Sequence, residues 1–132
     1  MEKSFYDVYY YLLKTAGQSL NLYLFSSYLV RNGKAFAAAF AQNASAQELS
    51  VLRAVQRPIS PACITVAMPP PLWRERPAWF LIAEQDRMIA AETQRFMAAR
   101  MKARTRSLPL DHAPMATAPD AVEEIILEAA RA

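Results

Sequence analysis

The stretch WFLIAEQD, residues 79–86, joins five consecutive apolar residues to a short polar segment that ends in an aspartate. Continuous rather than alternating apolar character is typical of a strand buried on both faces, as in a parallel sheet. A segment of helical character follows, and then a second apolar-ended run that leads into Leu110-Asp111-His112. We therefore predict strands at about residues 77–83 and 104–110, each followed by a loop that carries a titratable side chain.

Helical patterns surround these two strands, and local signals mark their beginnings. Ser45 and Glu48 have the spacing of a capping box, in which each side chain binds the other residue's backbone amide. Pro119-Asp120 places a proline and an acid in a first helical turn, where both are favourable. The predicted helices are residues 35–42, 45–56, 90–103 and 118–131.

Two of these helices have apolar positions that predict which side is buried. In the last helix the spacing i, i+3, i+4, i+7 predicts one buried stripe, formed by Val122, Ile125, Ile126 and Ala129. In the helix before it, the residues that share one side are Thr93, Phe96, Met97 and Met101. From residue 77 onward the order strand, helix, strand, helix predicts an α/β fold, with parallel strands joined by a right-handed crossover.

Asp86 and His112 follow the carboxyl ends of these two predicted strands. In parallel sheets, functional side chains gather in the loops at that edge, so we expect the two residues to meet in space. A histidine oriented by a carboxylate is the base of a catalytic triad. The alternative is that each is an ordinary loop residue, which caps a helix or lies in solvent.

Composition bounds the class of protein. The chain has 132 residues, of which 54% are hydrophobic and 20% are charged, as expected for one globular domain. The net charge is only +3, although arginines and lysines are dense between Arg87 and Arg106. No aromatic residues alternate with these charges as stacking platforms, so we favour a solvated helix face over a nucleic-acid site.

A single cysteine, Cys63, excludes a disulfide within the chain and a metal cluster of Cys and His. It agrees with a reducing cytoplasm, and in its apolar, proline-flanked stretch it is better explained as a core residue than as a nucleophile. No cofactor or metal is expected. The run 15–30 is too short and too polar to predict a membrane span.

Residues 1–33 differ in character, because they hold all six tyrosines. The shift in composition places a junction near Asn32-Gly33, which also resembles a turn. We favour helix for this segment, although aromatic residues are also common in strands. Residues 58–76 are proline-rich and predict a connector, with a short helical turn at 60–66.

Residues 34–132 resemble the C-terminal part of the α/β-hydrolase superfamily, in particular small bacterial esterase-like and haloperoxidase-like hydrolases. The stretches that carry the resemblance, in this order and spacing, are 56–58, 77–89, 94–101, 110–115 and 119–122. Residues 1–33 are outside it. The resemblance implies that 34–72 form a lid-like and connecting region and 73–132 the βαβα unit of a partial hydrolase fold.

The resemblance also implies roles for the two loop residues. Asp86 matches the catalytic acid, with Ala83 where the family often has glycine, and His112 matches the catalytic base. Asp111 stands where glycine usually precedes that histidine. The order of acid before histidine agrees with the family order of nucleophile, acid and histidine.

The family's nucleophile motif, Gly-x-Ser-x-Gly on a sharp turn, is missing from the chain. The nearest stretch, 17–21, has Gly17 two residues before Ser19 but Asn21 in place of the second glycine, so Ser19 is a poor candidate. With only two glycines in the chain, tight oxyanion loops are not expected either.

Two hypotheses follow from this combination. The chain is a truncated hydrolase, with esterase-type or amidase-type ancestry, that is inactive alone and could work with a complementary hydrolase half. Alternatively, it is a non-catalytic interaction protein built on a hydrolase fragment, for example a homo-oligomer. Attachment to a membrane surface through residues 5–30 is a third and weaker alternative.

Overall fold

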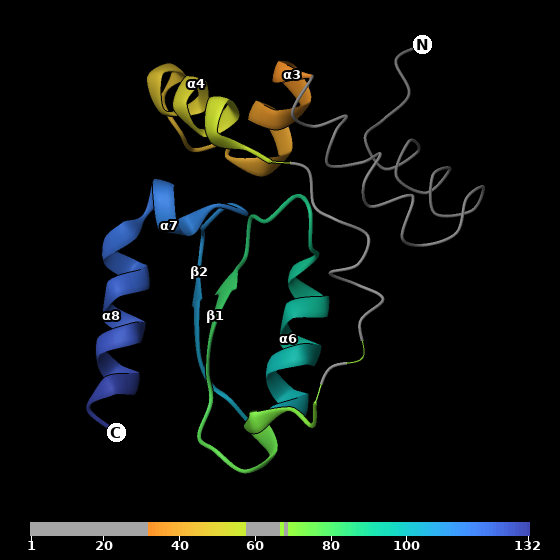
Figure 1. Ribbon diagram of the computed structural model, residues 1–132, viewed down its shortest axis with the longest axis vertical. Helices are drawn as coiled ribbons and strands as arrows, with labels where there is room; N and C mark the ends of the chain where they lie inside the picture. Colours follow the sequence, from red (N-terminus) through yellow and green to blue (C-terminus); the bar gives the residue numbers. More distant parts are fainter. Residues whose placement is uncertain (1–31, 58–66, 68) are drawn as a thin grey trace, which may run out of the picture.

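The computed structural model of the protein describes residues 32–57, 67 and 69–132 (Figure 1). The helix expected within residues 1–33 and the turn expected at 60–66 lie outside these ranges. The described elements are α3 (Gly33–Ala35), the π-helix η1 (Phe36–Phe40), α4 (Ala46–Val55), the 3-10 helix η2 (Leu72–Arg74), β1 (Trp79–Ala83), α6 (Ala91–Arg100), β2 (Arg104–Leu108), α7 (Pro114–Thr117) and α8 (Pro119–Ala130).

The two predicted strands are confirmed, and they pair in parallel. The register runs from Trp79 opposite Arg104 to Ala83 opposite Leu108. Beyond the ladder, the Glu84 amide donates to the Leu108 carbonyl at 2.9 Å and the Gln85 amide to the Leu110 carbonyl at 3.0 Å. The loops after both strands therefore begin side by side, which is the condition for a shared site at this edge.

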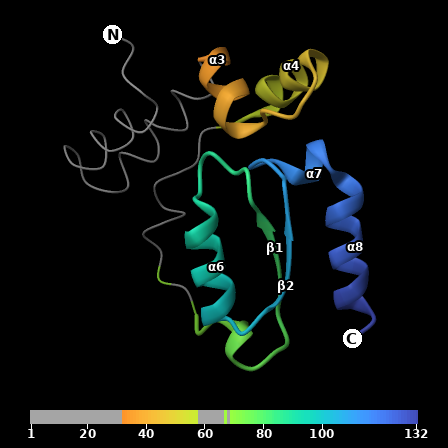
Figure 2. The same ribbon diagram turned by 180° about the vertical axis from the view of Figure 1, so that it is seen from behind.

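Helices α6 and α8 lie on opposite sides of the sheet (Figures 1 and 2). This explains why the apolar run in β1 is continuous, since both of its faces are covered. Ile82 and Ala83 are buried in the strand, Ala98 in α6 and Ile125 in α8. Burial of an aliphatic side chain such as Ile82 contributes about 1.5–3 kcal/mol.

The predicted apolar faces of the helices are only partly correct. In α6 the buried residues are Gln94 and Ala98, whereas Phe96 is 67% exposed and Met97 40% exposed. A small alanine lets α6 approach the strand, and Gln94 binds the strand's backbone. In α8 only Ile125 of the predicted stripe is buried, and Ile126 is 58% exposed.

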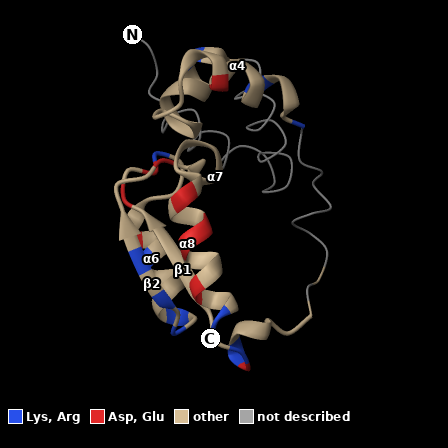
Figure 3. Cartoon of the chain, turned by 90° about the vertical axis from the view of Figure 1, so that its left-hand side faces the viewer, with Lys and Arg blue, Asp and Glu red and all other residues tan. Residues whose placement is uncertain are grey.

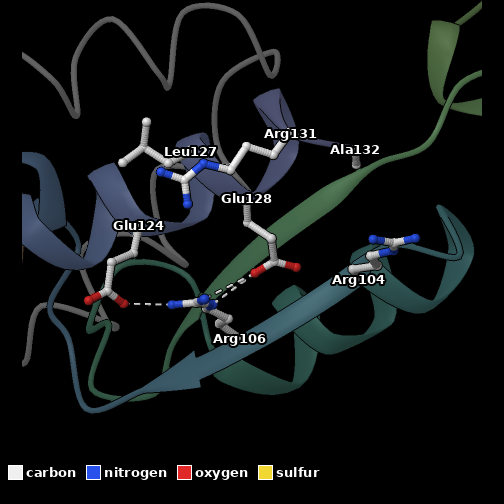
Figure 4. Close-up of a pocket in the computed structure, with 7 residues that line it drawn as sticks. All are labelled: Arg104, Arg106, Glu124, Leu127, Glu128, Arg131 and Ala132. Atoms are coloured by element: carbon white, nitrogen blue, oxygen red, sulfur yellow. Dashed lines mark hydrogen bonds and ion pairs between the residues drawn. The ribbon is translucent and has the colours of Figure 1, made fainter.

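Charged side chains connect helix α8 to β2, and Figure 3 shows acidic residues, in red, along α8. Arg106 donates to Glu124 at 2.6 Å and to Glu128 at 3.1 Å, and Glu128 also accepts from Trp79 Nε1 at 3.1 Å. The pairs line an open depression of about 410 Å³ together with Arg104 and Arg131 (Figure 4). Glu124 and Glu128 are both paired with Arg106, so these three side chains form a structural contact between strand and helix.

The Glu84 carboxylate connects the opposite face of β2 to α6. It accepts hydrogen bonds from Ser107 and from the guanidinium of Arg95. The Ser107 hydroxyl, and after it Arg95, hold the pKa of Glu84 below its usual value of 4.5. Hydrogen bonds from the Ser45 backbone amide and hydroxyl likewise lower the pKa of Glu48.

These shifts predict the sign of an acid effect on stability. A group whose pKa is lowered on folding stabilises the protein above its unfolded pKa, and that contribution is lost as the pH falls through the folded pKa. As the pH is lowered below about 4.5, we expect the melting temperature to decrease. This decrease should be less steep in Glu84→Gln than in the wild type. Glu123→Gln, which removes an exposed carboxylate, is the matched control in melting curves. Equal slopes for wild type and Glu84→Gln would contradict the expectation.

Residues 33–55, called the cap below, lie across the carboxyl-end edge of the sheet (Figures 1 and 2). Phe36 is 1% exposed and packs with Ala35, Phe40, Leu49, Leu52 and Met88. The helix expected at 35–42 is present as α3 and η1, and Asn32, expected in a turn, instead caps α3 by accepting from the Ala35 amide.

The predicted capping box at the start of α4 is confirmed. The Ser45 amide donates to Glu48 Oε2 at 2.7 Å, and the Glu48 amide donates to Ser45 Oγ at 3.3 Å. Leu49 and Leu52 of α4 pack on Phe36, whereas Val55 is 63% exposed. The start of α4 is thus determined locally, and its packing depends on η1.

Candidate active site

Asp86 lies in the turn directly after β1, and its backbone position is fixed by its own side chain. Its Oδ1 accepts from the amides of Met88 at 2.7 Å and Ile89 at 2.9 Å. The side chain is only 5% exposed. Because both Oδ1 contacts come from rigid backbone donors, Oδ2 is held in a defined direction, toward His112.

Gln94, on the buried face of α6, also hydrogen-bonds to the Asp86 carboxylate. Its Nε2 donates to Asp86 Oδ2 at 3.1 Å and to the Ile89 carbonyl at 2.9 Å. Its Oε1 accepts from the Ala83 amide at 2.9 Å, a group of β1 that does not pair with β2. Only an amide, with a donor and an acceptor, can satisfy all three partners.

His112 lies in the loop after β2, and its Nδ1 is 3.0 Å from Asp86 Oδ2. The predicted pair is therefore in contact, across neighbouring parallel strands. An ionised carboxylate only accepts hydrogen bonds, so Nδ1 carries the proton and the neutral imidazole keeps a free lone pair on Nε2. The histidine side chain is 24% exposed, which leaves the ring accessible at the edge of the site.

The cap supplies an aromatic wall to the same site. The Phe40 ring packs edge-on against the His112 ring, with centroids 5.4 Å apart and planes at 64°. Phe40 in turn stacks on Phe36 at 4.7 Å. Two further hydrogen bonds join the cap to the loop that carries Asp86. Gln42 Nε2 donates to the Gln85 carbonyl at 2.6 Å, and Arg87 donates to the Ala38 carbonyl at 2.9 Å.

Asp111, next to the histidine, is fully buried. Its Oδ2 accepts from the Asn43 amide at 3.0 Å, and its Oδ1 accepts from the Ala113 amide at 3.1 Å and the Thr117 hydroxyl at 2.7 Å. Each carboxylate oxygen therefore has a partner, although none of these partners is a cation. Sequence reasoning had identified Asp111 only as a departure from glycine.

No nucleophile is found beside the imidazole in the described part of the chain. Within residues 32–57 and 69–132, no serine or threonine hydroxyl hydrogen-bonds to His112. Ser45 caps α4 and Ser107 binds Glu84. Ser19 and Cys63 lie outside the described residues. The described ranges also contain no group of three acidic, His or Cys side chains that could hold a metal.

The site residues that sequence reasoning missed are Gln94, Asp111 and Phe40. Phe40 carried a usable signal, since Phe36 and Phe40 have helical spacing and precede the acid and base in the chain. Gln94 and Asp111 carried none, because a polar residue in an arginine-rich helix and an acid in a loop are each common on protein surfaces.

Comparison with known proteins gives one family match. A model described as the alpha/beta hydrolase family matches residues 9–125. The matched region therefore also includes residues 9–33, which the resemblance had left out. Searches of curated proteins and of solved structures found no match. No helix among the described residues has the length and apolar character to cross a membrane.

Proposed function

Because the chain belongs to the alpha/beta hydrolase family, we propose that it carries the acid and base of a Ser-His-Asp acyl-transfer site of esterase or amidase type. Asp86 is the acid and His112 is the base. The observation that supports this most directly is the 3.0 Å contact between His112 Nδ1 and Asp86 Oδ2. It joins two loops at the carboxyl-end edge of the sheet, where such sites are found.

In this proposal each residue has one chemical task. His112 Nε2 removes the proton of an attacking hydroxyl as its oxygen bonds to the acyl carbon. The imidazolium then returns that proton to the leaving alcohol or amine as the bond to the acyl carbon breaks. Asp86 holds the ring in the required tautomer and stabilises the imidazolium. General acid–base catalysis of this kind contributes about 10²–10⁴-fold in rate.

The attacking hydroxyl is not provided by a Gly-x-Ser-x-Gly motif of this chain, which has none. We therefore propose that the chain is inactive alone and that a complementary hydrolase segment on another chain supplies the nucleophile and the oxyanion hole. Residues 34–132 would be the acid–base half of that assembly. The described residues form a two-stranded sheet, which is consistent with this proposal because sheets of this size rarely stand alone.

A fluorophosphonate probe, which labels activated serines covalently, tests the proposal. The chain alone is expected to remain unlabelled by intact-mass spectrometry under conditions that label a serine esterase completely. When it is mixed with a segment that carries Gly-x-Ser-x-Gly and is encoded beside it, labelling of that serine should appear. His112→Gln should reduce this labelling at least about 100-fold, as expected for loss of a general base. Labelling of the chain alone would refute inactivity, and labelling insensitive to His112→Gln would refute the assigned base.

A non-catalytic interaction protein is the second candidate, and exposed apolar residues favour it. Phe96 and Met97 on α6 are 67% and 40% exposed, and Ile126 on α8 is 58% exposed. If association is the function, sedimentation velocity should show a stable homo-oligomer that Phe96→Glu dissociates, with Gln47→Glu, at an exposed position of α4, as the control outside the α6 face. A monomer at micromolar concentration would count against homo-oligomerisation.

A further inference from the structure

Asp111 is a buried carboxylate with no part in the proposed proton transfer. Its side chain is fully buried although no cation contacts it among the described residues. A buried charge is costly unless it is fully hydrogen-bonded. Its retention beside His112, where the resemblance leads one to expect glycine, therefore calls for a specific contact that a glycine could not make.

That contact is the hydrogen bond to the Asn43 amide, which is 68 residues away in the chain. Asn43 lies between η1 and α4, so it belongs to the cap, whereas Ala113 and Thr117 belong to the His112 loop and α7. One carboxylate thus holds both segments, through Oδ2 on the cap side and Oδ1 on the loop side. Charge-assisted bonds of this kind are about twice as strong as neutral ones.

We propose that Asp111 is a positioning residue that fixes the cap against the His112 loop and thereby keeps the Phe40 ring on the imidazole. The catalytic meaning of this role rests on the proposed function, because the position of the cap matters for turnover only if His112 is the base of an acyl-transfer site. The contact itself does not depend on that function. Phe40 is three residues before Asn43, so the hydrogen bond and the ring contact are made by the same short segment.

The substitution Asp111→Asn should break the hydrogen bond to the cap while it keeps those to the His112 loop and α7. All three partners of Asp111 are donors, but an asparagine offers one acceptor oxygen and one donor NH₂. Its oxygen is best placed at the Oδ1 position, where it keeps two donors, Ala113 and Thr117. The NH₂ group then faces the Asn43 amide, and the cap contact is the one that is lost.

Residue-resolved hydrogen exchange by NMR on the full chain tests this role. In Asp111→Asn the Asn43 amide should exchange roughly 10-fold to 100-fold faster, the factor for loss of one hydrogen bond to a charged group. The Leu49 amide, bonded to the Ser45 carbonyl within the cap, should keep its rate. The His112 ring-proton resonances, the only imidazole signals of the chain, should shift as Phe40 moves away.

Two control variants make the result specific. Thr117→Val removes one bond on the loop side only, so the Asn43 amide should stay protected. Asp120→Asn removes an exposed carboxylate in the first turn of α8 and should leave both signals unchanged. An unchanged Asn43 rate in Asp111→Asn would overturn the proposal, as would equal acceleration at Asn43 and Leu49, which indicates general unfolding.

If Asp111→Asn does not fold, the wild-type protein still decides the question. The Asn43 and Ala113 amides should both be protected, because they share one carboxylate acceptor. An Asn43 amide that exchanges at the rate of an unstructured peptide would overturn the proposal. None of these readouts requires turnover, so failure of this proposal is distinct from failure of the proposed function.

Discussion

Replacing Gln94 by leucine is expected to lower the free energy of unfolding by about 2–5 kcal/mol. Leucine has a similar size and helix propensity, so the change isolates the loss of the amide. It leaves the buried Ala83 amide and the partly exposed Ile89 carbonyl without their partner, and a buried group left unpaired costs about 1–3 kcal/mol. Asp86 also loses one of its four donors. Chemical denaturation at neutral pH measures the difference.

The matched control is Gln47→Leu, which makes the same chemical change at an exposed position in α4. This control should change the free energy of unfolding by less than about 0.5 kcal/mol, as surface substitutions usually do. Gln94→Glu should also destabilise strongly, since it places a second carboxylate beside Asp86. An equal change in the free energy of unfolding for Gln94→Leu and Gln47→Leu would contradict the proposed role of Gln94 in holding the loop that carries Asp86.

Truncating Phe36 to alanine is expected to cost about 3–5 kcal/mol, the range for a buried phenylalanine. Phe36 is 1% exposed and is the centre of the cap's apolar cluster, where it stacks on Phe40. Its loss removes the support that places Phe40 against His112. The effect should therefore appear both in the melting temperature and in the histidine ring-proton resonances.

Phe96→Ala removes the same side-chain atoms from a position that is 67% exposed on α6. It should cost less than about 1 kcal/mol, because little apolar area returns to water. A cost for Phe36→Ala as small as that for Phe96→Ala would show that the cap does not pack as described. A large cost without any change at His112 would separate cap stability from the candidate site.

The sheet and the contact between Asp86 and His112 could be predicted from the sequence because they depend on local patterns and one topological rule. The apolar run 79–83 indicates a strand covered on both faces, and strands in a βαβ unit place their following loops together. The contact between Asp86 and His112 follows from these two facts alone. The capping box at Ser45 was equally predictable, since both of its partners lie within four residues.

The supporting residues could not be predicted, because their roles depend on backbone groups far away in the chain. Gln94 is buried because the Ala83 amide, eleven residues earlier, needs an acceptor. Hydropathy instead favours burial of Phe96 and Met97. Asp111 is buried because the Asn43 amide approaches it across the cap. In both cases polar satisfaction, rather than apolar content, determines which side chain is inside.

The most direct test of the acid–base pair is the tautomer of the single histidine, read from the ¹⁵N chemical shifts of its ring. In the neutral state of the wild type, Nδ1 should be protonated and Nε2 unprotonated, because Nδ1 donates to Asp86. In Asp86→Ala the balance should move toward protonation at Nε2, whereas Asp120→Ala should leave it unchanged. A wild-type ring protonated at Nε2, or one that does not respond to the loss of Asp86, would contradict the account.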